Sequence, residues 1–224
     1  MTQDKIKEIL DDLNNLQENL LSLPDDMLLS LDPRDNESLE KGTRFIMAFN
    51  ENLDRFTEVS SKIATQIKSH FNINPEEDEI EQESDNLQKR DRIVKELDRT
   101  APHTLEENFT YKRPYGFVLE DAAYKGLKTW KNLYLNVLNI LREKDPEKFD
   151  QLPEEERFIS KRGKPLFSKN DKDLRIGERL ESGIFVEVNF SANTIRNNIK
   201  ELLEHFQINM KSMKIYLRED RDAS

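Results

Sequence analysis

The chain has 224 residues, of which 36% are charged and only 35% are hydrophobic, and its formal net charge is -10. It contains no cysteine, which excludes a disulfide framework, a thiolate nucleophile and a metal site with cysteine ligands. No apolar run approaches the ~20 residues of a membrane span or the core of a signal peptide, so we expect a soluble, cytoplasmic protein with no membrane contact.

The two halves of the chain differ in charge. Residues 1–107 contain 13 basic and 26 acidic side chains, whereas residues 108–224 contain 22 and 19. The net charges of -13 and +3 indicate different partners for the two halves. Glycines concentrate in the second half, so we expect a helical first half and a mixed second half.

Two periodic apolar stretches predict a helical hairpin over residues 1–74. In the first, apolar residues recur at alternating spacings of three and four, and Pro24 is expected to end the helix. The second is expected to begin after an N-cap at Asp35 and to run for about 35 residues, roughly 50 Å. Neither helix can bury its apolar seam alone, which favours a homodimer; the alternative is an intramolecular bundle with the C-terminal half. The predicted oligomerisation residues are Ile9, Leu13, Leu16, Leu20, Phe49, Leu53 and Phe56.

Residues 75–107 are predicted to be an acidic linker that includes a short helix. Residues 76–83 are mostly acidic and lack apolar periodicity, and such a block of like charge repels itself. This block is either a solubilising linker or a decoy that competes with nucleic acid for a basic patch. A short helix with Leu87, Ile93 and Leu97 is expected to follow and to stop before Pro102.

Residues 108–224 are predicted to form a small α+β domain, because the apolar period changes to the alternation of half-buried strands. The predicted order is β-β-α-β-β-α-β. The clearest strands are expected at 115–119, near 124, at 184–190 and at 213–217, with helices after Thr129 and after Ser191 or Asn193.

Several short segments of this domain resemble a recurring module. They are KRPYGF at 112–117, TWKNLY at 129–134, FSKN at 167–170, GIFVEVNFSAN at 183–193 and IYL at 215–217. Over residues 109–218 the chain resembles an uncharacterised C-terminal module of bacterial proteins associated with mobile elements and defence systems. The resemblance implies a nucleic-acid-related setting and assigns no catalytic residue.

The densest functional signal is a basic segment at residues 157–179. It contains eight basic and three acidic side chains, a local charge of +5 in an acidic chain. Flexible basic segments with nearby aromatic residues are typical of binding to a nucleic-acid backbone, which supplies affinity without sequence information. The alternatives are an acidic protein partner, or a solvated loop whose charges pair with the N-terminal half. The predicted nucleic-acid-binding residues are Arg157, Lys161, Arg162, Lys164, Lys169, Lys172 and Arg175.

Two smaller features have alternative interpretations. The segment 191–194 opens a helix directly after a strand, so its N–H groups either bind an anion, with Asn193 and Arg196, or are simply capped. The aromatic and basic residues 111–115 form either a second binding patch or part of a hairpin.

The sequence lacks a His-x-x-x-His pair, a Walker loop and a Gly-x-Ser-x-Gly elbow. The remaining enzymatic alternative is a metal-dependent nuclease that uses Asp171, Asp173 and Glu187 with Lys169, a weak signal in a chain rich in carboxylates.

We therefore expect no catalysis, no metal and no cofactor. The sequence favours an accessory protein of a bacterial defence or mobile-element system that dimerises through its helices and binds nucleic acid, DNA rather than RNA. The alternative function is a protein–protein adaptor or inhibitor of a larger complex, with an acidic helical rod and no nucleic-acid binding.

Overall fold

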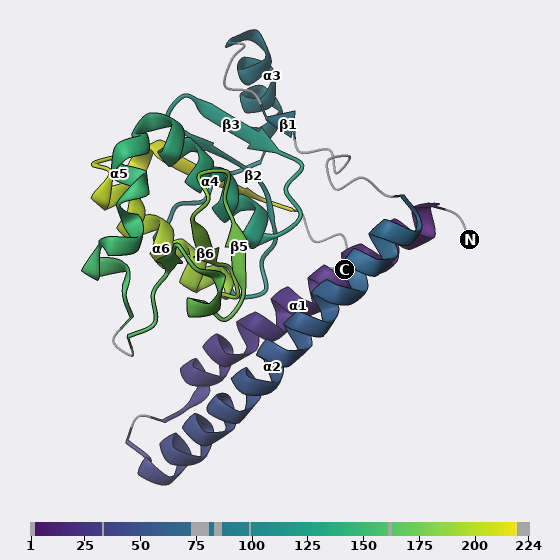
Figure 1. Cartoon of the computed structure of the whole chain (residues 1–224), viewed down its shortest axis with the longest axis vertical. Helices are drawn as coiled ribbons and strands as arrows, with labels where there is room; N and C mark the ends of the chain where they lie inside the picture. The colour runs from purple at the N-terminus through teal and green to yellow at the C-terminus, as the bar shows by residue number, and fades with distance from the viewer. Residues whose placement is uncertain are drawn as a thin grey trace.

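The computed structural model describes residues 3–32, 34–72, 81–82, 87–98, 100–160 and 163–218. Two long antiparallel helices form a hairpin, and a small domain of helices and antiparallel sheets lies against one side of it (Figure 1). One end of the hairpin projects beyond the domain, and the helix α3 lies at the end of the domain away from that projection. The predicted α+β class is confirmed.

The hairpin consists of α1 (Gln3–Ser30) and α2 (Asn36–His70). As predicted, Asp35 caps α2, because its side chain accepts hydrogen bonds from the backbone N–H groups of Glu37 and Ser38. Among the described helices, none combines the length and the apolar character that a membrane span requires. The buried apolar side chains of the hairpin are Ile6, Leu10, Ile46 and Leu53.

The predicted end of the first helix at Pro24 is wrong, because α1 continues through this proline to Ser30. A proline inside a helix has no N–H to donate to the preceding turn and usually interrupts it. Here the turn that follows is held by the domain, since the carboxylate of Asp25 accepts hydrogen bonds from Ser191 and Asn193. Tertiary contacts therefore outweigh the local propensity to break the helix.

Part of the predicted linker packs on the domain. The short helix is confirmed as α3 (Leu87–Leu97), and β1 (Glu81–Gln82) pairs antiparallel with β3 (Ala122–Lys125). The rest of the acidic block at 76–83 lies outside the described residues. A small core joins Ile93 and Leu97 of α3 to Val118, Ala123 and Tyr216 of the sheet.

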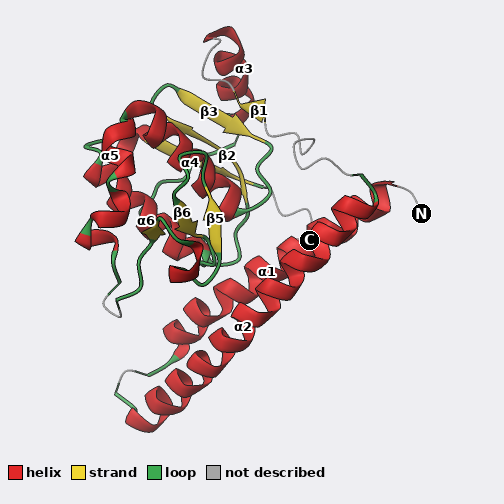
Figure 2. Ribbon diagram, viewed as in Figure 1, coloured by secondary structure: helices red, strands yellow, loops and turns green. Residues whose placement is uncertain are grey.

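The domain contains two antiparallel sheets (Figure 2). The first has the order β1-β3-β2-β7, with β2 (Pro114–Leu119) and β7 (Met213–Leu217). The second has the order β4-β6-β5, with β4 (Phe167–Ser168), β5 (Gly177–Arg179) and β6 (Phe185–Glu187). Three short strands thus lie between the two main helices, where the sequence predicted two. The strand predicted at 184–190 is shorter in the structure, where β6 ends at Glu187. Beyond this residue, the backbone N–H of Asn189 donates a hydrogen bond to the side chain of Glu187 instead of to a neighbouring strand.

The main helices of the domain are α4 (Trp130–Lys144) and α6 (Ala192–His205), with the short α5 (Pro146–Asp150) between them in sequence. Thr129 caps α4, and Ser191 rather than Asn193 caps α6. Single 3₁₀ turns span Leu152–Glu154, Glu156–Phe158, Asp171–Asp173 and Met210–Ser212. The largest side chains of the core are Trp130, Tyr124, Tyr134, Phe109, Phe117, Phe149 and Phe167.

Gly116 allows the closest approach within the first sheet. A Cβ atom at this position would lie 2.5 Å from the backbone oxygen of Tyr124 and 2.7 Å from a methyl carbon of Leu97. We expect Gly116→Ala to lower the free energy of unfolding by about 1–3 kcal/mol, measured by denaturant titration. Gly42→Ala is the control, because its Cβ would meet only the mobile end of the Leu31 side chain and alanine favours a helix. Equal losses in the two variants would contradict this account.

Candidate nucleic-acid interface and the junction with the hairpin

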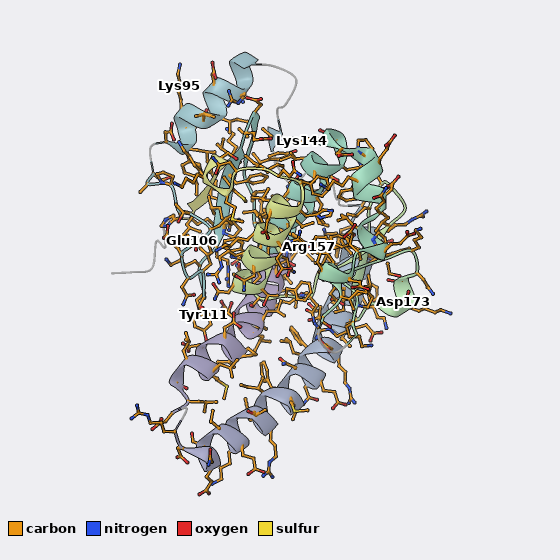
Figure 3. All side chains as sticks on the ribbon, turned by 90° about the vertical axis from the view of Figure 1, so that its left-hand side faces the viewer. Lys95, Glu106, Tyr111, Lys144, Arg157 and Asp173 are labelled. Carbon is orange, nitrogen blue, oxygen red and sulfur yellow. The ribbon has the colours of Figure 1, made fainter. Side chains whose placement is uncertain are left out.

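Three of the seven predicted nucleic-acid-binding residues meet at one groove. Arg157, Lys164 and Arg175 line a hollow of about 730 Å³ between the segment 157–175 and α6, which we call the basic groove. Figure 3 places Arg157 on the α+β domain, above the hairpin. The apolar side chains that line the basic groove are Phe158, Ile159, Pro165, Leu166, Leu174 and Phe190.

The cations of the basic groove differ in their contacts. Arg157 is exposed, and its guanidinium lies 3.0 Å from the carboxylate of Glu204. Lys164 is exposed to solvent. Arg175 reaches the hairpin, because its guanidinium lies 3.6 Å from the carboxylate of Asp54 in α2. The alternative in which basic charges pair with the acidic half therefore holds for Arg175.

The other predicted binding residues do not line the groove. The ammonium group of Lys169 lies 2.8 Å from Glu154, and Lys172 is exposed on the 3₁₀ turn beside it. Lys161 and Arg162 lie outside the described residues. The basic segment is therefore divided between the groove and a neighbouring turn.

The carboxylates of the nuclease alternative stabilise this segment. Asp173 accepts a hydrogen bond from the hydroxyl of Ser168 at 2.5 Å. In the part of the chain that the structure describes, no group of three or more histidine and acidic side chains is placed to hold a metal ion. Glu187 is buried, and its carboxylate accepts hydrogen bonds from the backbone N–H groups of Arg175, Ile176 and Asn189.

The predicted anion site at the start of α6 is filled by a carboxylate of the hairpin. Asp25 accepts a hydrogen bond from the hydroxyl of Ser191 at 2.7 Å and from the amide of Asn193 at 3.3 Å. Arg196 instead donates to the backbone oxygen of Glu107. The backbone N–H of Thr194 at this helix start is capped by the side chain of Ser191, which is the capping alternative. Asn193 contacts the carboxylate of Asp25 through its side-chain amide, and Arg196 donates to the backbone instead.

Asp25 is one of three carboxylates that α1 presents to the domain at intervals of seven residues. Asp11, Glu18 and Asp25 lie on one face of the helix, because seven residues make about two turns. Asp11 lies 3.3 Å from the ammonium group of Lys128. We call these three side chains the carboxylate row. The carboxylate row is not among the sites predicted from the sequence, although its seven-residue spacing is visible there.

Glu18 occupies the N-terminus of α4. One carboxylate oxygen accepts a hydrogen bond from the backbone N–H of Trp130 at 2.5 Å, and the other lies 3.4 Å from Nε of Arg113. An anion is favoured at this end of a helix, where N–H groups point outward. However, the side chain of Glu18 is only 11% exposed, and burial raises its pKa to about 7 despite the positive charges of Arg113 and Arg218.

The cluster at 111–115 contacts the hairpin rather than standing free. Arg113 donates hydrogen bonds to the backbone oxygen of Asn15 at 3.0 Å and to the side chain of Asn19. The hydroxyl of Tyr111 lies 3.5 Å from Asp26, and Figure 3 places Tyr111 where the domain meets the hairpin. Arg113 therefore anchors α1 through three of its residues, Glu18 included.

The junction between hairpin and domain is polar and incompletely packed. On the α2 side, Asn189 donates to the carboxylate of Asp54 at 2.8 Å and accepts from the hydroxyl of Thr57 at 3.3 Å. A cavity of about 260 Å³ remains between the two parts. Polar interfaces of this kind permit relative motion of the parts that they join. The polar side chains that line the cavity include Asn14, Gln17, Glu18, Ser61, Lys68 and Asn132.

The predicted oligomerisation residues fall into two groups. Leu53 is 5% exposed and buried in the hairpin, so it stabilises the hairpin itself. Ile9 and Leu16 are 40% and 48% exposed, and Leu13, Leu20, Phe49 and Phe56 are half-buried. At 3.6 residues per turn, Ile9 and Leu16 lie nearly opposite the carboxylate row on α1. We define the open apolar face of the hairpin as Ile9, Leu13, Leu16 and Leu20 of α1 with Phe45, Phe49, Phe56, Val59 and Ile63 of α2.

Comparison of the chain with protein-family models, with curated proteins and with solved structures finds no match.

The raised pKa of Glu18 makes the junction sensitive to pH. The ordinary pKa of a glutamic acid is 4.5, whereas the pKa of Glu18 in the docked hairpin is about 7. Between pH 4.5 and 7, docking of the hairpin is therefore accompanied by protonation of Glu18. Docking consequently becomes weaker as the pH rises through this range. The positive charges of Arg113 and Arg218 act on the same carboxyl and oppose the rise of its pKa. We expect Glu18→Gln to raise the midpoint of thermal unfolding by about 2–4 °C at pH 8. The gain should vanish by pH 5, and a gain that is independent of pH would contradict the burial argument.

Proposed function

We propose that this protein is a non-catalytic accessory protein that binds the backbone of nucleic acid, DNA in the first place, through the basic groove, and that forms homodimers through its hairpin. The observation that carries the proposal is the convergence of Arg157, Lys164 and Arg175 on one groove with apolar walls. A bacterial defence or mobile-element setting is part of the proposal and is supported by the resemblance of residues 109–218.

The groove supplies both contacts that a single strand needs. Cations at its rim neutralise phosphates and release counterions, which gives salt-dependent affinity. Its apolar walls, with the half-buried Phe190 and the exposed Ile159, accommodate base faces. Three carboxylates, those of Asp173, Glu187 and Glu201, also line the groove. The carboxylate of Glu187 is buried and accepts hydrogen bonds from backbone N–H groups, and that of Asp173 accepts a hydrogen bond from the hydroxyl of Ser168.

The open apolar face supports the homodimer. α1 is 28 residues long, about 42 Å, and two adjacent helices are about 20 Å wide, so the face offers roughly 800 Å². This is the area that each partner contributes to a standard stable interface. The domain lies on the other side of α1, so a second hairpin can approach without meeting it.

The same face supports a second candidate function. An exposed apolar surface on an acidic hairpin also fits a helix of a larger protein, as in an adaptor or inhibitor that binds no nucleic acid. Nucleic-acid titration separates the two functions, because only the first requires the basic groove.

We expect Arg157→Ala/Lys164→Ala, which removes two cations that line the groove, to weaken binding of a fluorescein-labelled oligonucleotide in anisotropy titrations. Each lost phosphate contact should reduce the slope of log affinity against log salt by about 0.7–0.9. The control is Lys41→Ala/Arg44→Ala, which removes the same charge from exposed positions of α2. Equal losses of affinity, or no binding by the unaltered chain at low salt, would reject the groove.

We expect Leu16→Asp/Ile63→Asp to convert the protein to monomers, because both side chains lie exposed on the open apolar face. Light scattering should then give 26.5 kDa, against twice that mass for the unaltered chain. Leu28→Asp/Leu29→Asp is the control, since these exposed residues lie at the end of α1, away from the face. A monomeric unaltered chain would refute the homodimer and favour the second candidate.

A further inference from the structure

We infer that the surface of the α+β domain beneath α1 is itself a binding surface for a nucleic-acid backbone, and that the carboxylate row covers it as an intramolecular competitor. This inference rests on the proposed function and extends the binding site from the basic groove into the junction with the hairpin.

Every member of the carboxylate row meets a donor of the kind that binds phosphate oxygens. Asp11 meets the ammonium group of Lys128. Glu18 meets a guanidinium and a backbone N–H at a helix N-terminus. Asp25 meets the hydroxyl of Ser191 and an amide. Ammonium, guanidinium, hydroxyl and backbone N–H groups are the usual donors to phosphate in nucleic-acid complexes.

The spacing of the row also fits a chain of anions. Asp11 and Asp25 are 14 residues apart, which is about 21 Å along α1. A strand of duplex DNA rises about 3.4 Å per phosphate, so roughly six phosphates span the same distance. An extended row of anion-binding groups therefore lies under one helix, rather than a single isolated anion site.

The covered surface is continuous with the basic groove. Phe190 lines both the groove and the cavity under the hairpin. Thr194 lines the groove, and its hydroxyl lies 3.1 Å from that of Ser191, which binds Asp25. A strand that follows the groove along α6 thus reaches the position that Asp25 occupies.

The hairpin is held by contacts that a polyanion can replace. The junction is polar, it encloses the 260 Å³ cavity, and one carboxylate oxygen of Glu18 is buried without a hydrogen bond. Phosphates that enter the junction would take over the donors of Lys128, Arg113 and Ser191 as the carboxylates leave them. Displacement therefore exchanges one set of charge-assisted contacts for another.

The test compares two full-length double variants that lose the same charge. Asp11→Asn/Asp25→Asn weakens the row, whereas Glu40→Gln/Glu58→Gln alters exposed acids of α2 that pair along the helix. The probe is a fluorescein-labelled 20-nucleotide oligothymidine, titrated at 50 and 200 mM salt. We expect the first variant to bind about tenfold more tightly than the unaltered chain, and the second to change affinity by about twofold or less.

A second measurement needs no variant. Hydrogen exchange of the Trp130 amide, which donates to Glu18, should become faster when the oligonucleotide is added. Equal affinities for the two variants, or an amide that stays protected, would overturn the inference. If the oligonucleotide still bound through Arg157 and Lys164 in that case, the proposed function would stand; if the unaltered chain bound no oligonucleotide, both would fall.

Discussion

The arrangement of the molecule depends on carboxylates of α1 that meet the donors of the domain. Glu18 lies at the N-terminus of α4, and Asp25 binds the cap of α6, so one face of a single helix is fixed to the two main helices of the domain. Hydrogen bonds and ion pairs to carboxylates of α1 therefore position the hairpin on the domain. This explains why a half with net charge -13 packs on a half with net charge +3.

Fixing that face of α1 determines what the other faces can do. The side toward α2 buries Ile6 and Leu10, and the side away from the domain leaves Ile9 and Leu16 exposed. One helix thus serves three surfaces, each with its own chemistry. Changes to the acidic face act on the domain, and changes to the exposed apolar side act on assembly, so the two effects can be separated by mutation.

Local signals predicted the elements well, and tertiary contacts decided the rest. The N-caps at Asp35 and Thr129 could be predicted from the sequence. Capping is a local interaction between a short polar side chain and the first N–H groups of the helix that follows it. The helix end predicted at Pro24 was wrong, because the contacts that stabilise α1 beyond this proline come from residues distant in the sequence, such as Ser191. The charge pattern of the sequence identified the basic segment. Its division between the groove and the turn at Lys169 could not be predicted, because it depends on ion pairs such as Lys169 with Glu154 that the sequence does not reveal.

Trp130 is the only tryptophan of the chain, and it lies at the point where α1 meets the domain. Its backbone N–H binds Glu18, its indole N–H donates to the backbone oxygen of Lys112 at 2.8 Å, and its ring packs 4.7 Å from that of Phe109. Indole emission depends on the polarity and the solvation of these surroundings. The fluorescence of Trp130 is therefore an intrinsic probe, without an added label, of whether the hairpin is docked on the α+β domain.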